Sequence, residues 1–194
     1  MSFDLILRNI GRVVQLTEEE QKEFCSLLTI RHVKKKQLLV KPGEISLHEN
    51  FINKGCFRNY IIDREGTERN FYFAIEGWWI SDIHSRTFNV PSFAYVYAVE
   101  DSELVQILQT DLDNIMMKFP KLEHFFRLTY QKSTASIQFQ LLQRLYLSAE
   151  EQYLSFRTKY PEFDRRIPQK HIATYLGFTP EFFNTVRTKI LKQI

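Results

Sequence analysis

The sequence predicts an α+β protein in which a strand-rich N-terminal region precedes a long helix and a C-terminal helix-turn-helix. Three observations predict this order. Residues 31–110 form short β-branched and aromatic runs separated by turn signals, residues 121–147 contain neither glycine nor proline, and residues 167–194 have the spacing of two helices joined by a tight turn. With 194 residues, 44% of them hydrophobic and 25% charged, the chain has the length and composition of a globular protein.

Residues 17–30 form the first predicted helix. Thr17 is followed three residues later by Glu20, which is the spacing of a capping box, and acidic residues fill the first turn, where the helix dipole favours them. Phe24, Leu27 and Leu28 recur at helical spacing. We therefore expect a short amphipathic helix here.

Three turn signals punctuate the strand-rich region. They are KPGE at residues 41–44, NKG at 53–55 and DREGTE at 63–68. The second is predicted to be a hairpin turn with Gly55 at positive φ, and the third lies between two strand-like runs. About eight short strands in about 80 residues predict a sandwich, a barrel or a jelly roll.

From residue 111 onward the pattern is helical. A short helix ends near Phe119-Pro120, and a helix of about 27 residues, about 40 Å long, is predicted over 121–147. Such a helix is longer than a small domain needs, and a second copy around a two-fold axis would cover its apolar stripe. We therefore expect a homodimer. The residues predicted to form the dimer seam are Phe126, Ile137, Leu141 and Leu145.

After a further helix over 149–160 and a linker at 161–166, residues 167–194 predict a helix-turn-helix. The first helix directs Ile172, Ala173 and Leu176 inward, and Gly177 stands where the chain must leave that helix in a left-handed conformation. Thr179 is a good N-cap and Pro180 a good first residue for the second helix. The inward residues of the second helix are Phe183, Val186 and Ile190.

The outward side of the second helix has the chemistry of DNA recognition. Glu181, Asn184 and Thr185 can meet base edges, whereas Lys170, Arg187 and Lys189 suit phosphates. The distribution of charge also favours a polyanionic partner for the C-terminal part. Residues 1–112 contain 13 Lys and Arg against 16 Asp and Glu, whereas residues 113–194 contain 13 Lys and Arg against 7 Asp and Glu. An ordinary αα-hairpin with a solvated face is the alternative. The predicted DNA contacts are Gln169, Lys170, Thr179, Glu181, Asn184, Thr185, Arg187, Thr188 and Lys189.

Several other function classes lack support in the sequence. The apolar runs are too short to span a bilayer, and the N-terminus does not have the pattern of a secretory signal. Cys25 and Cys56 are too few for a disulfide scaffold, which fits a cytoplasmic protein. The five histidines have no metal-binding spacing, and no nucleotide-binding loop or catalytic motif is present. We predict neither a metal site nor an enzyme.

The order of these elements, with KPGE, NKG, GWWISDI, Ile167-Pro168-Gln169 and the Leu176–Glu181 turn, resembles the transcription regulators of the Crp/Fnr type, and most closely their Bacteroidetes-type variants. The resemblance implies a cyclic-nucleotide-binding β-roll as sensor over 1–110, a dimerisation helix over 111–147 and DNA binding over 148–194. It implies promoter DNA as a partner and makes RNA polymerase a candidate partner. The alternative is a ligand-binding module that contacts proteins without binding DNA.

The resemblance does not extend to the usual ligand site. The family's Gly-Glu pair corresponds to Ser81-Asp82, and its phosphate-binding arginine corresponds to Ser92. A buried phosphate without a cation is costly, so cyclic AMP is not the expected effector, although Arg86 could substitute. Trp78-Trp79 either lines a pocket or belongs to the core. The predicted effector pocket comprises Trp79, Ser81, Asp82, Arg86, Ser92, Phe93 and Thr129, and the effector itself stays open.

The second helix also departs from the family pattern. The arginine usual at its first position is Pro180, and a later arginine is Thr185, whereas Glu181 is retained. We therefore expect a target sequence that differs from the family's usual palindromes.

Overall fold

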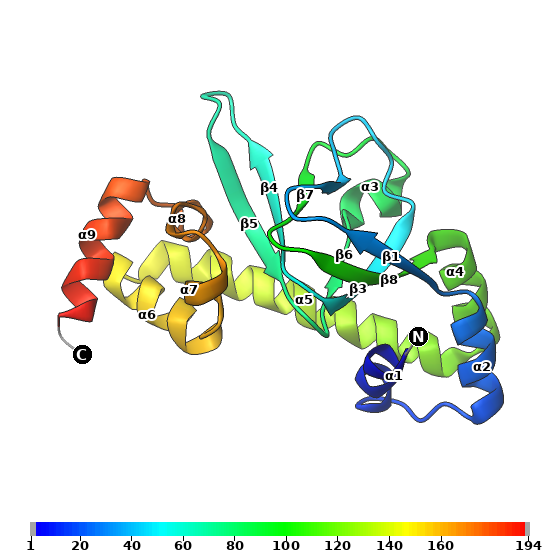
Figure 1. Cartoon of the computed structure of the whole chain (residues 1–194). Coiled ribbons are helices and arrows are strands. Elements are labelled where there is room, and N and C mark those ends of the chain that lie inside the picture. Colours follow the sequence, from blue (N-terminus) through cyan, green and yellow to red (C-terminus); the bar gives the residue numbers. More distant parts are fainter. Residues whose placement is uncertain (1–2, 193–194) are drawn as a thin grey trace. The chain divides into compact units, whose positions relative to one another are not determined.

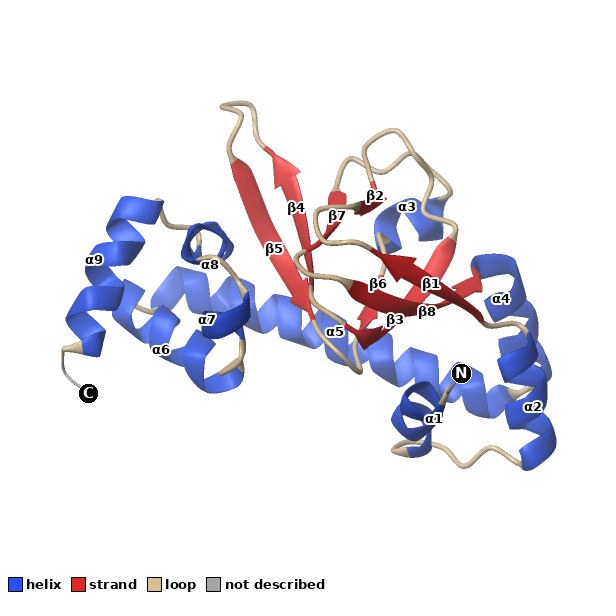
Figure 2. Ribbon diagram, viewed as in Figure 1, coloured by secondary structure: helices blue, strands red, loops and turns tan. Residues whose placement is uncertain are grey.

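The computed structural model describes residues 3–192 and has the predicted α+β fold (Figure 1). Its strands form two four-stranded sheets (Figure 2). The first, in spatial order, comprises β1 (Thr29–Val33), β8 (Ser102–Leu108), β3 (His48–Lys54) and β6 (Trp79–Ile80). The second comprises β2 (Leu38–Val40), β7 (Tyr95–Ala98), β4 (Phe57–Ile62) and β5 (Glu68–Ala74).

The first sheet is antiparallel, and its register sorts the side chains of β3 onto two faces. Phe51 lies opposite Val105, and Asn50 opposite Gln106. Because successive side chains in a strand alternate, Glu49 and Phe51 share one face and Asn50 and Ile52 the other. On the first face, Phe51, Val105 and Ile107 pack against the helices that flank the sheet. The buried helical residues of this core are Ile6, Ile10, Phe24, Leu112, Ile115, Leu122, Phe125 and Phe126.

Five helices accompany the sheets. They are α1 (Asp4–Gly11), α2 (Glu18–Ser26), α3 (Ile83–Phe88), α4 (Gln109–Lys118) and α5 (Pro120–Tyr146). The predicted capping box of α2 is confirmed, since the Glu20 N–H donates to Thr17 Oγ1 at 3.2 Å and the Thr17 N–H donates to Glu20 Oε2 at 2.7 Å. The sequence analysis did not anticipate α1. Residues 111–147 hold parts of two helices, because Phe119 is extended ahead of Pro120.

Four further helices follow, namely α6 (Ala149–Lys159), α7 (Phe163–Arg166), α8 (Gln169–Leu176) and α9 (Pro180–Leu191). Helix α7 occupies the segment that we expected to be a linker, and its Phe163 is buried, so this connection is part of the core. Within residues 3–192, no helix is long and apolar enough to cross a membrane.

The NKG segment is not the hairpin turn that its sequence suggested. Strands β3 and β4 belong to different sheets; Asn53 and Lys54 end β3, and Gly55 and Cys56 carry the chain from one sheet to the other. Gly55 does have a positive φ of 112°, and a Cβ there would lie 2.0 Å from Ser102 Oγ. The glycine is therefore required by close packing as well as by backbone conformation. The predicted turn at 63–68 does join neighbouring strands, with the Asp63 N–H donating to the Thr67 carbonyl at 3.0 Å.

The chain forms two compact units. The roll unit comprises residues up to Asn59 together with Phe73–Lys132, and the helical unit comprises Tyr60–Tyr72 together with the chain from Ser133 onward. Helix α5 contributes residues to both units. The tip of the β4–β5 hairpin, although it is an extension of a sheet, groups with the C-terminal helices.

Candidate nucleic-acid interface and effector site

Helices α8 and α9 form the predicted helix-turn-helix. Gly177 ends α8 in the left-handed conformation with a φ of 87°, and the Phe178 N–H donates to the Ala173 carbonyl at 2.9 Å. Thr179 caps α9, since its Oγ1 accepts from the Phe182 N–H at 3.2 Å, and Pro180 is the first helical residue. The cap, the left-handed turn and the proline were all predicted from the sequence, and all are confirmed.

The inward side of α9 is fixed by an aromatic core within the helical unit. Phe183 is buried and meets the Tyr153 ring of α6 edge to face, with ring centroids 5.0 Å apart. Val186 and Ile190 are buried on the same side, as predicted. Tyr153 in turn donates from its hydroxyl to Asp164 Oδ2 at 3.1 Å. The orientation of α9 about its own axis is therefore determined by packing.

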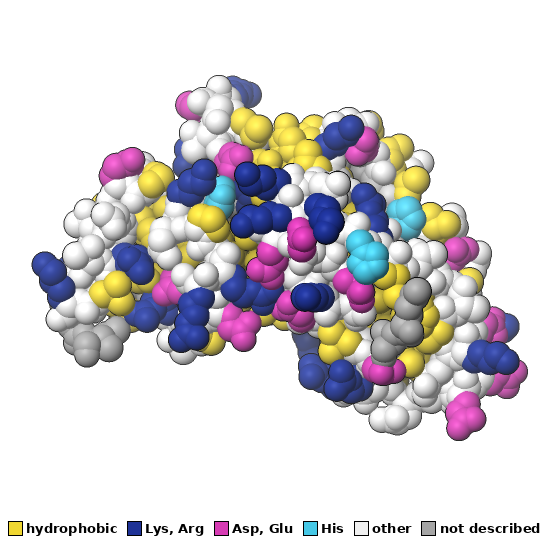
Figure 3. Space-filling view, viewed as in Figure 1, with side chains coloured by type: hydrophobic (Ala, Val, Ile, Leu, Met, Phe, Trp, Pro, Cys, Tyr) yellow, Lys and Arg dark blue, Asp and Glu magenta, His cyan; other side chains and the backbone are white. Residues whose placement is uncertain are grey.

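This packing leaves the predicted base-reading side chains in solvent. Glu181, Asn184, Thr185 and Thr188 are all exposed. Thr185 Oγ1 donates to the Glu181 carbonyl at 3.2 Å, and within residues 3–192 the side chains of Glu181, Asn184 and Thr188 make no hydrogen bond. Figure 3 shows mainly uncharged side chains over α9, with an acidic group at its upper end and basic groups along its lower edge. A carboxylate, an amide and hydroxyls presented in this way can exchange hydrogen bonds with base edges.

The residues predicted to contact phosphates differ in their exposure and in their partners. Lys170 is exposed, but Lys189 pairs with Glu150 of α6 at 2.7 Å. Arg187 is half-buried, and its Nε is enclosed by protein. Gln169 is half-buried as well and donates to the Asp164 carbonyl at 3.3 Å. Lys170 and Lys189 are both exposed, and of the two only Lys170 has no ion pair within residues 3–192.

One exposed residue at the border of this surface, Phe182, was not predicted from the sequence. Phe182 is 50% exposed and lies beside Phe178, with ring centroids 5.3 Å apart. The sequence did contain a signal for this residue. Phe182 directly precedes the inward-facing Phe183 and does not fit the helical spacing of the buried residues of α9.

A strand also contacts the helix-turn-helix within the helical unit. Asn70 of β5 is buried, and its amide donates to Thr174 Oγ1 of α8 at 2.7 Å and lies 3.4 Å from His171 Nδ1. Glu68 of the same strand lies 3.7 Å from His171 Nδ1. The hairpin thus fixes the first helix of the motif through hydrogen bonds that no local sequence pattern indicated.

In the roll unit, Arg86 is the centre of a buried polar cluster. Its guanidinium pairs with Glu49 of β3, and both side chains are almost inaccessible to solvent. The Tyr130 hydroxyl of α5 accepts from Arg86 Nη2 at 3.0 Å and donates to Glu49 Oε2 at 3.0 Å. Gln109 accepts a further hydrogen bond from Arg86, and Ser81 lies 3.5 Å from Glu49. We call these five residues the Arg86 cluster.

Burial sets the protonation equilibria of the Arg86 cluster. It raises the pKa of the Glu49 carboxyl, while the charge of Arg86 opposes this shift. Burial likewise raises the pKa of the Tyr130 hydroxyl, with the charge of Glu49 as a further cause. The cation that could have substituted for the family's phosphate-binding arginine is thus neutralised by a carboxylate of the chain itself.

The other predicted effector residues do not join the Arg86 cluster. Ser92 donates to Asp82 Oδ2 at 2.5 Å, and Asp82 Oδ1 caps α3 by accepting from the Ser85 N–H at 3.2 Å. Thr129 Oγ1 donates to the Phe125 carbonyl of its own helix at 2.9 Å. Phe93 is largely exposed.

Trp79, for which the sequence left a pocket and the core open, is partly buried and packs against the core of the roll unit. Its ring lies 5.1 Å from that of Phe51 and 4.9 Å from that of Phe126. Its Nε1–H donates to Asn9 Oδ1 of α1 at 3.3 Å.

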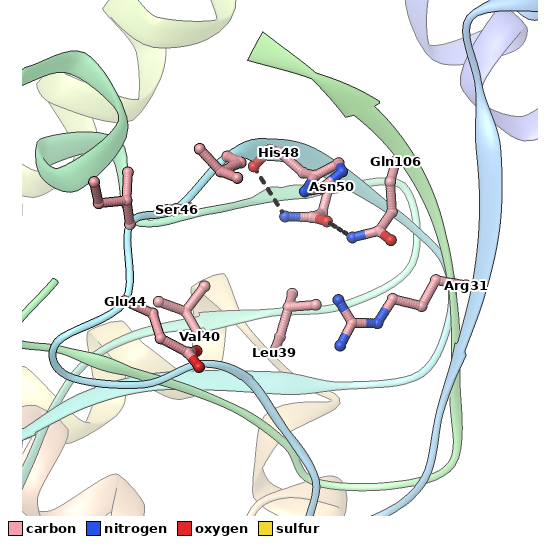
Figure 4. Close-up of a pocket in the computed structure, with 10 residues that line it drawn as sticks. Arg31, Leu39, Val40, Glu44, Ser46, His48, Asn50 and Gln106 are labelled. Carbon is pink, nitrogen blue, oxygen red and sulfur yellow. Dashed lines mark hydrogen bonds between the residues drawn. The ribbon is translucent and has the colours of Figure 1, made fainter. Parts of the chain in front are cut away.

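A small cavity lies elsewhere in the roll unit (Figure 4). Its volume is about 100 Å³, whereas pockets that hold drug-sized ligands are at least about 300 Å³. Arg31, His48, Asn50 and Gln106 line it, and the Gln106 amide donates to Asn50 Oδ1 at 2.5 Å. Burial and the nearby charge of Arg31 lower the pKa of His48. The cavity contains none of the predicted effector residues and is too small for a nucleotide.

The predicted dimer seam divides into an exposed part and a buried part. Ile137, Leu141 and Leu145 are more than half exposed on the second half of α5. Phe126 is buried in the core of the roll unit and is therefore removed from the seam. Further exposed apolar residues near the three are Phe139, Leu142 and Tyr146. Across residues 3–192, no group of three potential ligands could hold a metal ion.

Comparison with known proteins found similarity over most of the chain. No protein-family model matches it. It is 25% identical over 178 residues to regulatory protein HlyX of Actinobacillus pleuropneumoniae, covering 86% of this chain and 73% of HlyX. A regulator assigned to the Crp/Fnr family from Eubacterium rectale has a TM-score of 0.70 and 18% identity, over 92% of this chain and 85% of that one. The c-di-GMP-responsive global regulator CLP of Xanthomonas campestris has a TM-score of 0.71 and 11% identity, over 91% and 93%.

Proposed function

The chain resembles the Crp/Fnr-type transcription regulators in sequence and in fold, and we propose that it binds double-stranded DNA sequence-specifically and regulates transcription. The observation that carries this proposal is α9, a capped helix whose packing leaves Glu181, Asn184 and Thr185 exposed. In a helix-turn-helix, the N-terminal residues of the second helix meet base edges in the major groove. The same comparisons favour a regulator over an enzyme. We propose that the protein acts in the cytoplasm.

We further propose that two copies of the chain act together. Ile137, Leu141 and Leu145 present an apolar stripe on the second half of α5, which a second α5 would cover. A two-fold dimer would place its recognition helices on half-sites about 34 Å apart. Within each copy, residues 1–110 would sense the signal, 111–147 would associate, and 148–194 would bind DNA, with RNA polymerase as a further partner.

The signal is an effector other than cyclic AMP. Arg86 is already paired with Glu49, and Ser92 with Asp82, so the two positions best suited to a cyclic phosphate are occupied by the chain's own groups. Any effector would act by favouring one of two arrangements of the DNA-binding helices. Asn70 of β5 is hydrogen-bonded to Thr174 of α8. A displacement of the β4–β5 hairpin would therefore also displace the helix-turn-helix.

The test is selection of bound duplexes from a randomised library, followed by titration at two salt concentrations. We expect a two-fold symmetric consensus and binding that weakens steeply with salt. Light scattering on the same sample should give a dimer. The double variant Glu181→Ala/Asn184→Ala should lose the consensus, whereas Glu123→Gln, a change in an exposed pair on α5, should retain it.

A library from which no sequence is enriched would reject DNA recognition. It would favour the alternative, a ligand-binding module that uses its C-terminal helices to contact proteins. A monomer that binds DNA would reject only the dimer.

A further inference from the structure

Phe182 is an apolar residue that remains half exposed in the unbound state, with the ring of Phe178 beside it. It is the third residue of α9, and its ring is 50% exposed, whereas the ring of Phe183 is buried. Burial of Phe183 explains the packing of the helix without any contribution from its neighbour.

Phe182 lies in the first turn of α9, at the edge of the side that we propose to face DNA. It follows Glu181 in the first turn, about 100° further around the helix, and Thr185 lies three residues on, between the directions of the two, so Phe182 stands at the border of the exposed side of α9. The first turn of a recognition helix is the part that reaches base edges. A side chain at the border of this turn can reach a base edge at the side of the groove.

The ring is also held in place before any DNA binds. Phe178, in the turn, meets it edge to face with centroids 5.3 Å apart, and the Phe182 N–H is fixed to the Thr179 cap. A side chain that is ordered in advance loses little conformational entropy on binding.

The chemistry of the ring limits what it can recognise. A phenyl group has no hydrogen-bond donor or acceptor, and the one apolar group on base edges in the major groove is the C5 methyl of thymine. We propose that Phe182 is a specificity-determining residue that contacts one thymine methyl group in each half-site. This inference rests on the proposed DNA binding and extends it to a particular base.

The experiment removes the methyl group from the DNA instead of the ring from the protein. Starting from the selected consensus duplex, each thymine is replaced in turn by deoxyuridine in both half-sites, and the dissociation constant is measured for the wild type, Phe182→Ala and Phe182→Leu. For one thymine position, we expect the wild type to lose about four-fold in affinity per half-site, the factor for burial of one methyl group. Phe182→Ala should bind the two duplexes equally well, and Phe182→Leu should show an intermediate ratio.

Leu191→Ala is the matched control, because Leu191 is also an exposed apolar residue of α9 but lies at its far end. It should retain the full deoxyuridine effect. If no deoxyuridine weakens the wild type, or if Phe182→Ala shows the same loss as the wild type, the assignment is wrong even though the protein binds DNA. Failure of the wild type to bind any duplex would instead reject the proposed function.

Discussion

The roll unit and the helical unit each contain a cluster of polar side chains, and the two differ in where their hydrogen bonds go. Arg86, Glu49 and Tyr130 satisfy one another in the interior. Glu181, Asn184 and Thr188 point into solvent and make no side-chain hydrogen bond within the described part of the chain. The first arrangement stabilises the fold and leaves no charge for a ligand, whereas the second is available to a partner. Of the two ligand sites that the sequence suggested, the structure thus leaves one open.

The largest expected effect tests the interior cluster. Glu49→Gln leaves Arg86 buried without a counter-ion, so the free energy of unfolding should fall by about 3–5 kcal/mol, as for other broken buried pairs. Urea denaturation followed by circular dichroism measures it. Glu123→Gln, which disrupts an exposed pair with Arg127 at 3.8 Å, should cost less than about 0.5 kcal/mol.

Replacing both partners should restore most of the loss. In Glu49→Leu/Arg86→Met no unpaired charge remains, and apolar groups of similar size often substitute for buried pairs without cost. If Glu49→Gln is as mild as Glu123→Gln, the cluster is not the closed, stabilising element described above.

The exposed cluster should respond in the opposite way. Glu181→Ala and Asn184→Ala should each relax the preference at one base pair per half-site by about 1–3 kcal/mol. Stability should hardly change, because neither side chain has a partner to lose within residues 3–192. Binding to a randomised site library measures the preference, and thermal unfolding provides the control. An unchanged consensus in Glu181→Ala would mean that α9 presents another side to the DNA.

A smaller, non-selective effect is expected from the cations around α9. Lys170→Gln and Arg187→Ala should weaken binding to all sequences alike and reduce the salt dependence by about one unit per monomer. Lys170 is exposed and Arg187 half-buried, so Lys170→Gln is the cleaner change. Titration of consensus and scrambled duplexes over a range of salt tests this. A loss confined to the consensus would show that these residues read bases.

For the binding of cyclic AMP we expect no measurable effect. Cyclic AMP should produce no heat of binding with the wild type, because Arg86 is neutralised and Ser92 provides no charge. Ser92→Arg supplies a cation, and any residual binding should be stronger in that variant. Micromolar affinity in the wild type would show that the Arg86–Glu49 pair opens to admit an anion.

The features that the sequence predicted well are those with local causes. Gly177, Thr179 and Pro180 each act within one turn of the chain, so the geometry of the helix-turn-helix followed from residue order alone. The NKG segment was misinterpreted because a turn signal does not say which sheet the next strand will join. The partner of Gly55 is Ser102, which is remote in the sequence.

The Arg86 cluster could not have been predicted from the sequence. Glu49 and Arg86 lie in elements with no shared pattern, and only the packing of β3, α3 and α5 brings them together. Phe126 belonged to an apolar stripe that continued to Leu145, and periodicity does not reveal that the first half of the stripe is already covered. Periodicity shows which side of a helix is apolar, and tertiary packing decides what covers it.

The chain crosses between its two compact units three times, after Asn59, after Tyr72 and after Lys132. Proteins whose domains are joined by one linker can be divided there into fragments that fold alone. Truncation after Lys132 would instead keep the hairpin tip and remove α8, which uncovers the buried amide of Asn70 and takes away Thr174. The roll unit and the helical unit are therefore not exchangeable at a single linker, and a chimaera of this protein needs to carry residues 60–72 together with the helix-turn-helix that they contact.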